Sequence, residues 1–367
     1  MTSSIFAWIS RGNREQKAII LQLALVVFYA TLVLGSGLVK FDEILAIWLI
    51  YLSGAYALWA IFGMFVLIGM LLTQMELGQA SPPLGQWLKS LIMERWERDR
   101  GLSLIALPFL LATLISAFNA FKQFILVKST FRFDALFEQW DHILFLGHDP
   151  WQVTHALFGS LAATSFLDHV YHAWFSLMPL GVLLCAWQSK STWRLRTQFL
   201  LSYIGVWILL GSILAWFLPA AGPVFVPALV GPSPTYSDLH AALMQTDAHN
   251  SLESIALQQM LLGSHTQTKM AMGVGISAMP SVHNALAILY CLTTFAINRK
   301  LGILFGLYAF AIWIGSIHLG WHYAVDGVAS LILMIGLWKL TGLVAERLDK
   351  QAVSPEYQRA AEGSLAV

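Results

Sequence analysis

Charged residues are scarce in this sequence. Asp, Glu, Lys and Arg make up only 11% of the 367 residues, while 57% are hydrophobic. A soluble domain normally has about a quarter charged residues, so a soluble globular protein is excluded and a polytopic membrane protein is indicated. The formal net charge is +1. That argues against a nucleic-acid partner, because proteins with such partners carry strongly basic surfaces.

Cysteine and N-glycosylation signals are also rare or absent. The two cysteines, Cys185 and Cys291, fall within apolar runs, where they are expected to pack as small hydrophobic residues and say little about redox compartment. No Asn-x-Ser/Thr triplet occurs in the chain. This absence is compatible with a bacterial origin, and a bacterial inner membrane is the expected location.

Long apolar runs dominate what the sequence does contain. A membrane-spanning helix needs about 20 apolar residues. Eight segments approach this length, and they cover residues 18–39, 46–73, 102–125, 163–187, 197–218, 281–298, 301–319 and 323–345. We therefore predict an all-α, polytopic membrane helix bundle with about eight transmembrane helices.

Lysine and arginine are unevenly divided between the two sets of alternating loops. Sixteen of them fall on the side that holds both termini, and the other side has only Lys40, Lys122, Lys128, Arg132 and Lys269. By the positive-inside rule, both termini are expected in the cytoplasm. The opposite, outward side carries a segment from Phe133 whose apolar residues have helical spacing, which predicts an amphipathic interfacial helix.

The sixth apolar run begins with "AMPSVHNALAILYCL", residues 278–292. Proline is favoured at the first helical position, so Pro280 is expected to begin a helix whose first amides face outward without partners. Such amides, with the positive end of the helix dipole, form an anion site. The Ser281 hydroxyl is expected to donate to a bound anion, and His283 is expected to lie within one turn of it.

A second outward stretch, "GSIHLGWHYAVD" at residues 315–326, contains three titratable groups: His318, His322 and Asp326. Residues four apart on a helix lie nearly above one another. Asp326 is therefore expected to accept a hydrogen bond from one nitrogen of His322 and leave the other free to act as a nucleophile. His283 is then the candidate acid.

These two motifs, "PSVH" and "GWHYAVD", resemble the type 2 phosphatidate phosphatase superfamily, whose second and third motifs run P-S-G-H and S-R-x5-H-x3-D. The resemblance implies that His322 becomes phosphorylated, that Asp326 orients it and that His283 protonates the leaving oxygen, without a cofactor. It also implies a six-helix catalytic core over residues 102–345, which leaves a two-helix extension at 1–101 and a cytoplasmic tail at 346–367.

The sequence departs from the family pattern where the family binds a phosphate dianion. Ser316 stands in place of the arginine of the third motif, Val282 replaces the glycine of the second, and no K-x6-R-P motif is evident. A site with few cations suits a singly charged phosphodiester. The pattern resembles the branch of inositol phosphorylceramide synthases and sphingomyelin synthases, which implies transfer of a phospho-headgroup from a membrane lipid to an acceptor alcohol.

Several alternatives remain open at this stage. A lipid phosphatase that releases phosphate to water is the main one, and a zinc site formed by His283, His318, His322 and Asp326 or a proton-coupled transporter are others. Further candidates for substrate contacts are Ser316, His318 and the outward pair Asp168 and His172, which are one turn apart and could instead pair with each other.

Overall fold

The computed structural model describes residues 14–76, 101–187, 193–265 and 270–352. Within these ranges the chain forms helices joined by turns and loops, and it contains no β-strand. The prediction of an all-α helix bundle is therefore confirmed. Of the predicted divisions, residues 1–13 and 77–100 of the extension and residues 353–367 of the tail lie outside the described residues.

Six described helices are long and apolar enough to cross a membrane. They are Glu15–Gly35, Phe41–Phe65, Ile105–Phe124, Trp193–Phe217, Arg299–His318 and Ala324–Lys350. The two remaining predicted segments are also helical. Residues 163–187 lie in α8 (Leu161–Trp187), whose first half carries polar side chains. Residues 281–298 fold as α14 (Val282–Ile297), which at 1.5 Å per residue spans about 24 Å, less than the ~30 Å hydrocarbon core.

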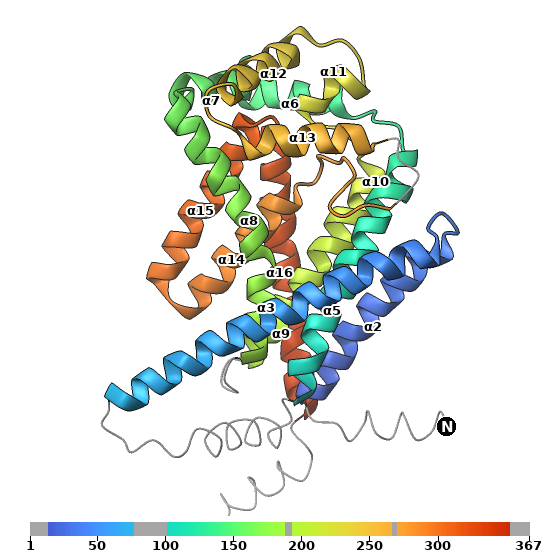
Figure 1. Ribbon diagram of the computed structural model, residues 1–367, viewed down its shortest axis with the longest axis vertical. Helices are drawn as coiled ribbons and strands as arrows, with labels where there is room; N and C mark the ends of the chain where they lie inside the picture. The colour runs from blue at the N-terminus through green and yellow to red at the C-terminus, as the bar shows by residue number, and fades with distance from the viewer. Residues whose placement is uncertain (1–13, 77–100, 188–192, 266–269, 353–367) are drawn as a thin grey trace, which may run out of the picture.

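The long helices form a bundle around α16 and α14 (Figure 1). α14 packs against α15 and α16, α16 packs against α9, and both α2 and α3 pack against α5. Their bounds are α2 Arg14–Gly35, α3 Phe41–Glu76, α5 Gly101–Ala120, α9 Trp193–Gly205, α15 Arg299–His318 and α16 Ala324–Ala352. α5 continues through a π-helical turn, Phe121–Ile125, and α9 continues through a π-helical segment, Val206–Leu214, into α10 (Ala215–Phe217).

Short helices cover one end of the bundle, at the top of Figure 1. They are α6 (Asp134–Leu144), α7 (Pro150–Phe158), α11 (Val226–Leu229), α12 (Pro234–Asp247) and α13 (Glu253–Ser264). The segment predicted as an amphipathic helix from Phe133 is α6, in which Phe137 is fully buried while Ile143 is 69% exposed. We refer to these five helices as the cap.

One carboxylate, Asp134 at the start of α6, ties the cap to the bundle. Its oxygens accept hydrogen bonds from the amides of Ala221 and Gly222, each at 3.0 Å. The hydroxyl of Tyr323 donates to the same carboxylate at 2.9 Å. Gly222 has φ +96°, and a Cβ there would lie 2.7 Å from the carbonyl oxygen of Trp321. This close approach needs glycine and fixes residues 220–222 against the loop that carries His322.

Candidate active site

His322 and Asp326 come together where α15 ends and α16 begins. Nδ1 of His322 lies 3.2 Å from Oδ2 of Asp326, and the amide of Tyr323 donates to the same oxygen at 3.2 Å. Because a carboxylate only accepts, this contact places the ring proton on Nδ1 and leaves a lone pair on Nε2. The backbone amide of His322 donates to the carbonyl of Ser316, which further fixes the position of the residue.

A second carboxylate, Asp141 of α6, caps the helix that carries Asp326. Its two oxygens each accept from one of the first amides of α16, those of Ala324 and Val325, at 2.8 Å. These amides have no intrahelical partner, so the carboxylate satisfies donors that would otherwise be buried and unpaired. Burial nevertheless raises the pKa of Asp141 to about 7. Sequence reasoning did not identify Asp141 as a functional residue, because its partners are almost two hundred residues away.

His283, in the first turn of α14, lies against aromatic rings of α8. Its ring stacks on Trp174, with a centroid distance of 4.0 Å, and on Tyr171 at 4.9 Å. The His283 and His322 ring centroids are 6.1 Å apart. Nε2 of His283 is buried and has no hydrogen-bond partner among the described residues. The aromatic contacts hold the ring in place while this nitrogen stays available to a bound molecule.

The two histidines line one cavity of about 380 Å³. This volume falls within the range of small-molecule sites, roughly 300–1,000 Å³. The wall is mostly apolar, and its residues come from α3, α5, α8, α13, the segment that precedes α14 and the loop before α16. Trp321, next to His322, also lines it. A molecule in this space can therefore contact both histidines and a large apolar surface at once.

Lys122 lines the same cavity. Among the described residues, it is the one lysine or arginine in the cavity wall. It lies in the π-helical turn after α5, and residue 275, a glycine with φ +101°, packs directly against it. Sequence reasoning counted Lys122 only as an outward charge. A lysine within an apolar helix was nevertheless a recognisable signal, because charges at membrane depth usually face a functional interior.

The observed start of α14 differs from the predicted one at Pro280 and Ser281. Pro280 was expected at the first helical position, but the helix begins at Val282 with Ser281 as its N-cap. The Ser281 hydroxyl accepts from the amide and the side chain of Asn284, at 3.3 and 3.0 Å, and the residue is fully buried. A serine N-cap accepts a hydrogen bond from an amide that has no partner within the helix. This contact sets the helix start, although proline is favoured at the first helical position. Pro280, Val282 and His283 line the cavity, and Ser281 does not.

Ser316 is fully buried behind the site and does not line the cavity. Its hydroxyl donates to the carbonyl of Trp313 at 2.7 Å and accepts from the side chain of Asn284 at 3.4 Å. These contacts link the end of α15 to the start of α14. The side chain therefore holds the two motif segments together on the side away from the cavity.

His318 lies away from the cavity. Its ring stacks on His155 of α7, with centroids 4.0 Å apart, and its Nε2 is 3.0 Å from the hydroxyl of Thr164. His155 Nε2 donates to the His318 carbonyl at 2.9 Å. Burial lowers the pKa of His155, which agrees with a neutral ring. The structure thus separates His318 from His283 and His322, with which it was considered as a possible zinc ligand.

Asp168 and His172 pair with each other. Nδ1 of His172 lies 3.3 Å from Oδ1 of Asp168. The two oxygens of Asp168 also accept from the first amides of α13, those of Glu253 at 2.8 Å and Ser254 at 3.1 Å. Asp168 is fully buried, and neither residue lines the cavity. In this structure the pair joins α8 to the cap.

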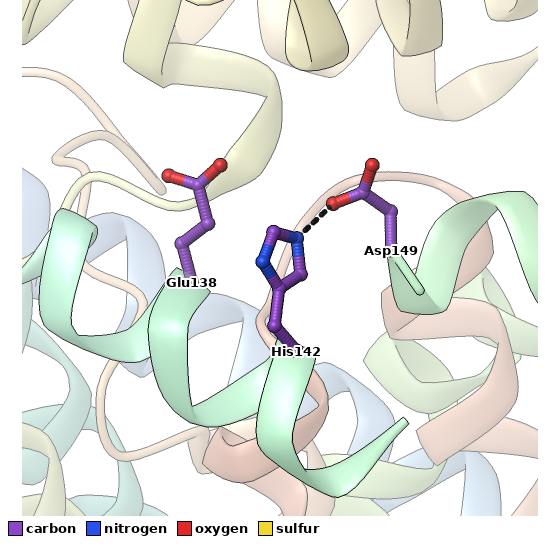
Figure 2. Close-up of side chains that lie close together, drawn as sticks. All are labelled: Glu138, His142 and Asp149. Atoms are coloured by element: carbon purple, nitrogen blue, oxygen red, sulfur yellow. Dashed lines mark hydrogen bonds and ion pairs between the residues drawn. The ribbon is translucent and has the colours of Figure 1, made fainter. Parts of the chain in front are cut away.

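One group of side chains in the described part of the chain could hold a metal ion. It consists of Glu138 and His142 on α6 and Asp149 before α7, whose candidate ligand atoms all lie within 4.8 Å of one another. Figure 2 shows His142 between the two carboxylates, with its Nε2 2.6 Å from Oδ1 of Asp149. These residues do not line the cavity. Their ion pair also accounts for the arrangement without a metal.

Comparison with known proteins identifies the family. The family model of the PAP2 superfamily matches residues 136–340, more than half of the chain, and the match includes His283, His322 and Asp326 but not Lys122. No curated protein and no solved structure matches this chain. The matched range contains both motifs and the helices that hold them at one cavity. The chain belongs to the PAP2 superfamily, whose members carry out phosphatase or phosphotransferase chemistry on lipid phosphates.

Proposed function

We propose that this protein cleaves a lipid phosphodiester and transfers the phospho-headgroup, through a phosphohistidine on His322, to an acceptor alcohol. The observation that carries the proposal is the cavity itself. It has one lysine and two histidines at a mostly apolar wall, and Nδ1 of one histidine contacts a buried carboxylate. Membership of the PAP2 superfamily supports an enzyme of this general class.

The first half of the reaction uses groups already in position. The phosphate binds beside Lys122 and the first amides of α14, which have no intrahelical partner. The lone pair on Nε2 of His322 attacks phosphorus, and the bond between phosphorus and the lipid alcohol oxygen breaks. Protonated His283 gives its proton to the departing oxygen. Negative charge on the bound phosphate favours the protonated form of the ring.

The second half reverses these roles. His283, now neutral, takes the proton from the acceptor hydroxyl as its oxygen attacks the phosphohistidine. The new oxygen–phosphorus bond forms, the nitrogen–phosphorus bond breaks, and His322 returns to its starting state with Nδ1 still bonded to Asp326. Water in place of the alcohol gives hydrolysis by the same steps.

Charge favours a diester over a monoester as the substrate. A diester carries one negative charge, which Lys122 balances whether or not His283 is protonated, whereas a monoester is balanced only while His283 is protonated. A monoester near neutral pH carries close to two charges, and an uncompensated charge in an apolar cavity is costly. Ser316, where the family has an arginine, is buried behind the site and supplies no second cation. The inositol phosphorylceramide synthase-like activity is therefore the version that we propose.

A lipid phosphatase is the second candidate, and Lys122 is the observation that favours it. Lys122 and a protonated His283 together supply two positive charges at the cavity, enough to balance a monoester dianion. In this alternative, phosphatidate or a polyprenyl phosphate phosphorylates His322 and water completes the cycle.

The phosphoenzyme provides the direct test. Purified protein is mixed with a lipid donor labelled in its headgroup, quenched within milliseconds under alkaline conditions that preserve phosphohistidine, and analysed by peptide mass spectrometry. We expect the label on His322, and no label in His322→Ala. Turnover in the His322→Ala protein, or a label on another residue, would contradict the mechanism.

A further inference from the structure

The cavity extends well beyond the groups that handle the phosphate. Three of its residues, Ile115, Asn119 and Lys122, follow one face of the helix that begins as α5. Seven residues of helix rise about 10 Å, so Ile115 lies that far along the wall from Lys122. We call the part of the cavity wall formed by Ile115, Tyr51 of α3 and Met272 the apolar arm.

The arm is lined by side chains that suit a hydrocarbon. Besides Ile115, these are Tyr51 of α3 and Met272, which lie close to Asn119, one turn from Ile115, because Asn119 binds residues 271 and 273. Leu257 and Met260 of α13 and Ile276 line the same cavity. Methionine side chains are flexible and adapt to irregular apolar shapes. Met260 is 45% exposed and Met272 is 43% exposed, so the cavity wall reaches the protein surface at these two residues.

The N-terminal extension builds one side of the arm. The hydroxyl of Tyr51 lies near the backbone of Gly273, and Glu43 Oε2 accepts from the amide of Met270 at 2.9 Å. Both side chains belong to α3, which crosses the bundle obliquely in Figure 1. The family match begins at residue 136, so this wall lies outside the matched region.

Residues 270–273 are held from a second side as well. Asn119 donates from Nδ2 to the carbonyl of Ala271 at 2.7 Å and accepts through Oδ1 from the amide of Gly273 at 2.7 Å. Gln123 accepts from the amide of Ala271 at 3.0 Å. Together with Glu43 and Tyr51 of α3, these bonds fix the segment as a firm wall between α3, α5 and the cavity.

We propose that the apolar arm binds one hydrocarbon chain of the lipid donor, and that Tyr51 sets how much of that chain it accepts. The inference rests on the proposed function, because the arm is continuous with the space that holds His283 and His322. A donor whose phosphate lies beside Lys122 extends its chain past Asn119 and Ile115. The chain leaves the protein beside Met272, where the cavity wall is exposed.

The first test compares two donors that share a headgroup but carry palmitoyl or hexanoyl chains. Tyr51→Trp narrows the arm, and each methylene that it excludes lowers kcat/KM for the long-chain donor about fourfold. With one or two methylenes excluded, we expect the ratio of long-chain to short-chain kcat/KM to fall by roughly tenfold. The matched control is Tyr56→Trp, because Tyr56 of the same helix donates to the carbonyl of Ile105 and does not line the cavity. An unchanged ratio in an active Tyr51→Trp enzyme would overturn the proposal.

A binding measurement covers the case in which Tyr51→Trp does not fold. His322→Ala protein, which keeps Tyr51 and cannot turn over, is irradiated with a donor that carries a diazirine near the end of one chain. We expect cross-links in α3 and in residues 270–276 that an unlabelled donor displaces. Cross-links elsewhere, or cross-links there only with a labelled acceptor, would overturn the assignment. A wild-type protein that forms no phosphoenzyme would refute the proposed function but leave the cross-linking result interpretable.

Discussion

Asp326 has the position of a group that sets the tautomer of a neighbouring histidine. Its Oδ2 contacts Nδ1 of His322 and the amide of Tyr323. Asparagine at 326 keeps the shape of the side chain but removes the charge that favours a proton on Nδ1. The lone pair on Nε2, which the proposed attack on phosphorus needs, is then no longer assured.

We expect Asp326→Asn to lower kcat by roughly 10³- to 10⁴-fold, the order of loss found when a triad orienter loses its charge. The unfolding temperature, followed in the same detergent, should change by only a few degrees. His169→Ala is the matched control, because His169 is exposed and its Nδ1 contacts only the carbonyl of Ser165. A loss of activity below tenfold would mean that Asp326 does not orient the nucleophile.

Lys122 should act on substrate affinity and on the reaction barrier through its charge. Lys122→Met keeps the length of the side chain and removes the charge, so one charge-assisted contact to phosphate is lost. Such contacts are worth about 1.5–3 kcal/mol, which predicts a fall in kcat/KM of roughly 10- to 100-fold for an anionic lipid. Lys128→Met, in the next turn at an exposed position, should have little effect. Equal losses of kcat/KM in both variants would show that Lys122 does not contact the substrate phosphate.

Among contacts between single residues, the sequence predicted those that depend on short spacing. The pairing of His322 with Asp326 follows from four residues of separation, and the structure has it. The role of Lys122 in the cavity and the pairing of Asp168 with the amides of α13 depend on segments far apart in the chain. A single sequence contains no direct signal for those contacts.

Helix α6 of the cap contacts the start of α16 directly and caps it. Asp141 of α6 accepts hydrogen bonds from the amides of Ala324 and Val325, which are the two residues before Asp326. Because burial raises the folded-state pKa of Asp141 to about 7, its titration favours the folded state at low pH. This contribution is present below the unfolded-state pKa and is lost as the pH rises through about 7.

The unfolding temperature of the wild type should therefore fall relative to that of Asp141→Asn as the pH is raised from 5 to 8. An asparagine does not titrate, so the variant supplies the baseline for every other group. The measurement is a thermal unfolding series in detergent at each pH, with both proteins in the same buffers. If the difference in unfolding temperature between the two proteins stays constant from pH 5 to 8, Asp141 does not change protonation on unfolding.

Helices were the part of the fold that the apolar runs predicted well. All eight predicted segments overlap helices, because runs of this length can satisfy their backbone groups in no other simple way within a membrane. Residues 36–39 of the first segment lie beyond the end of α2, and six of the described helices, rather than eight, are long and apolar enough to span. α14 begins two residues later than predicted, because the Ser281 side chain caps the helix. The preference of proline for the first helical position takes no account of such a cap. The five cap helices have weaker patterns, and only α6 was predicted from its amphipathic spacing.

For the whole molecule, the uneven division of lysine and arginine predicts which end faces outward. Ser237 lies exposed on α12 in the cap, and Lys300 lies exposed at the start of α15. α15 has 20 residues and ends at His318, so about 30 Å of helix separates Lys300 from the segment that carries His322. Cysteines at these two positions therefore report on opposite ends of the bundle.

In a background without Cys185 and Cys291, we expect Ser237→Cys to react with a membrane-impermeant maleimide added to intact cells. Lys300→Cys should react only after the membrane is opened, because the positive-inside rule places that end in the cytoplasm. Labelling is read from a gel shift. The reverse pattern would move the proposed active site to the cytoplasmic face.

Competition between two donors shows whether the cavity transfers a phospho-headgroup from a diester or releases phosphate from a monoester. Purified enzyme in detergent receives phosphatidate and a glycerophospholipid diester together, with and without a long-chain alcohol, and the products are quantified by mass spectrometry. With one lysine at the cavity, we expect the diester to be consumed faster and its headgroup to appear on the alcohol. Faster release of free phosphate from phosphatidate, with no headgroup on the alcohol, would contradict the transferase and establish the phosphatase in its place.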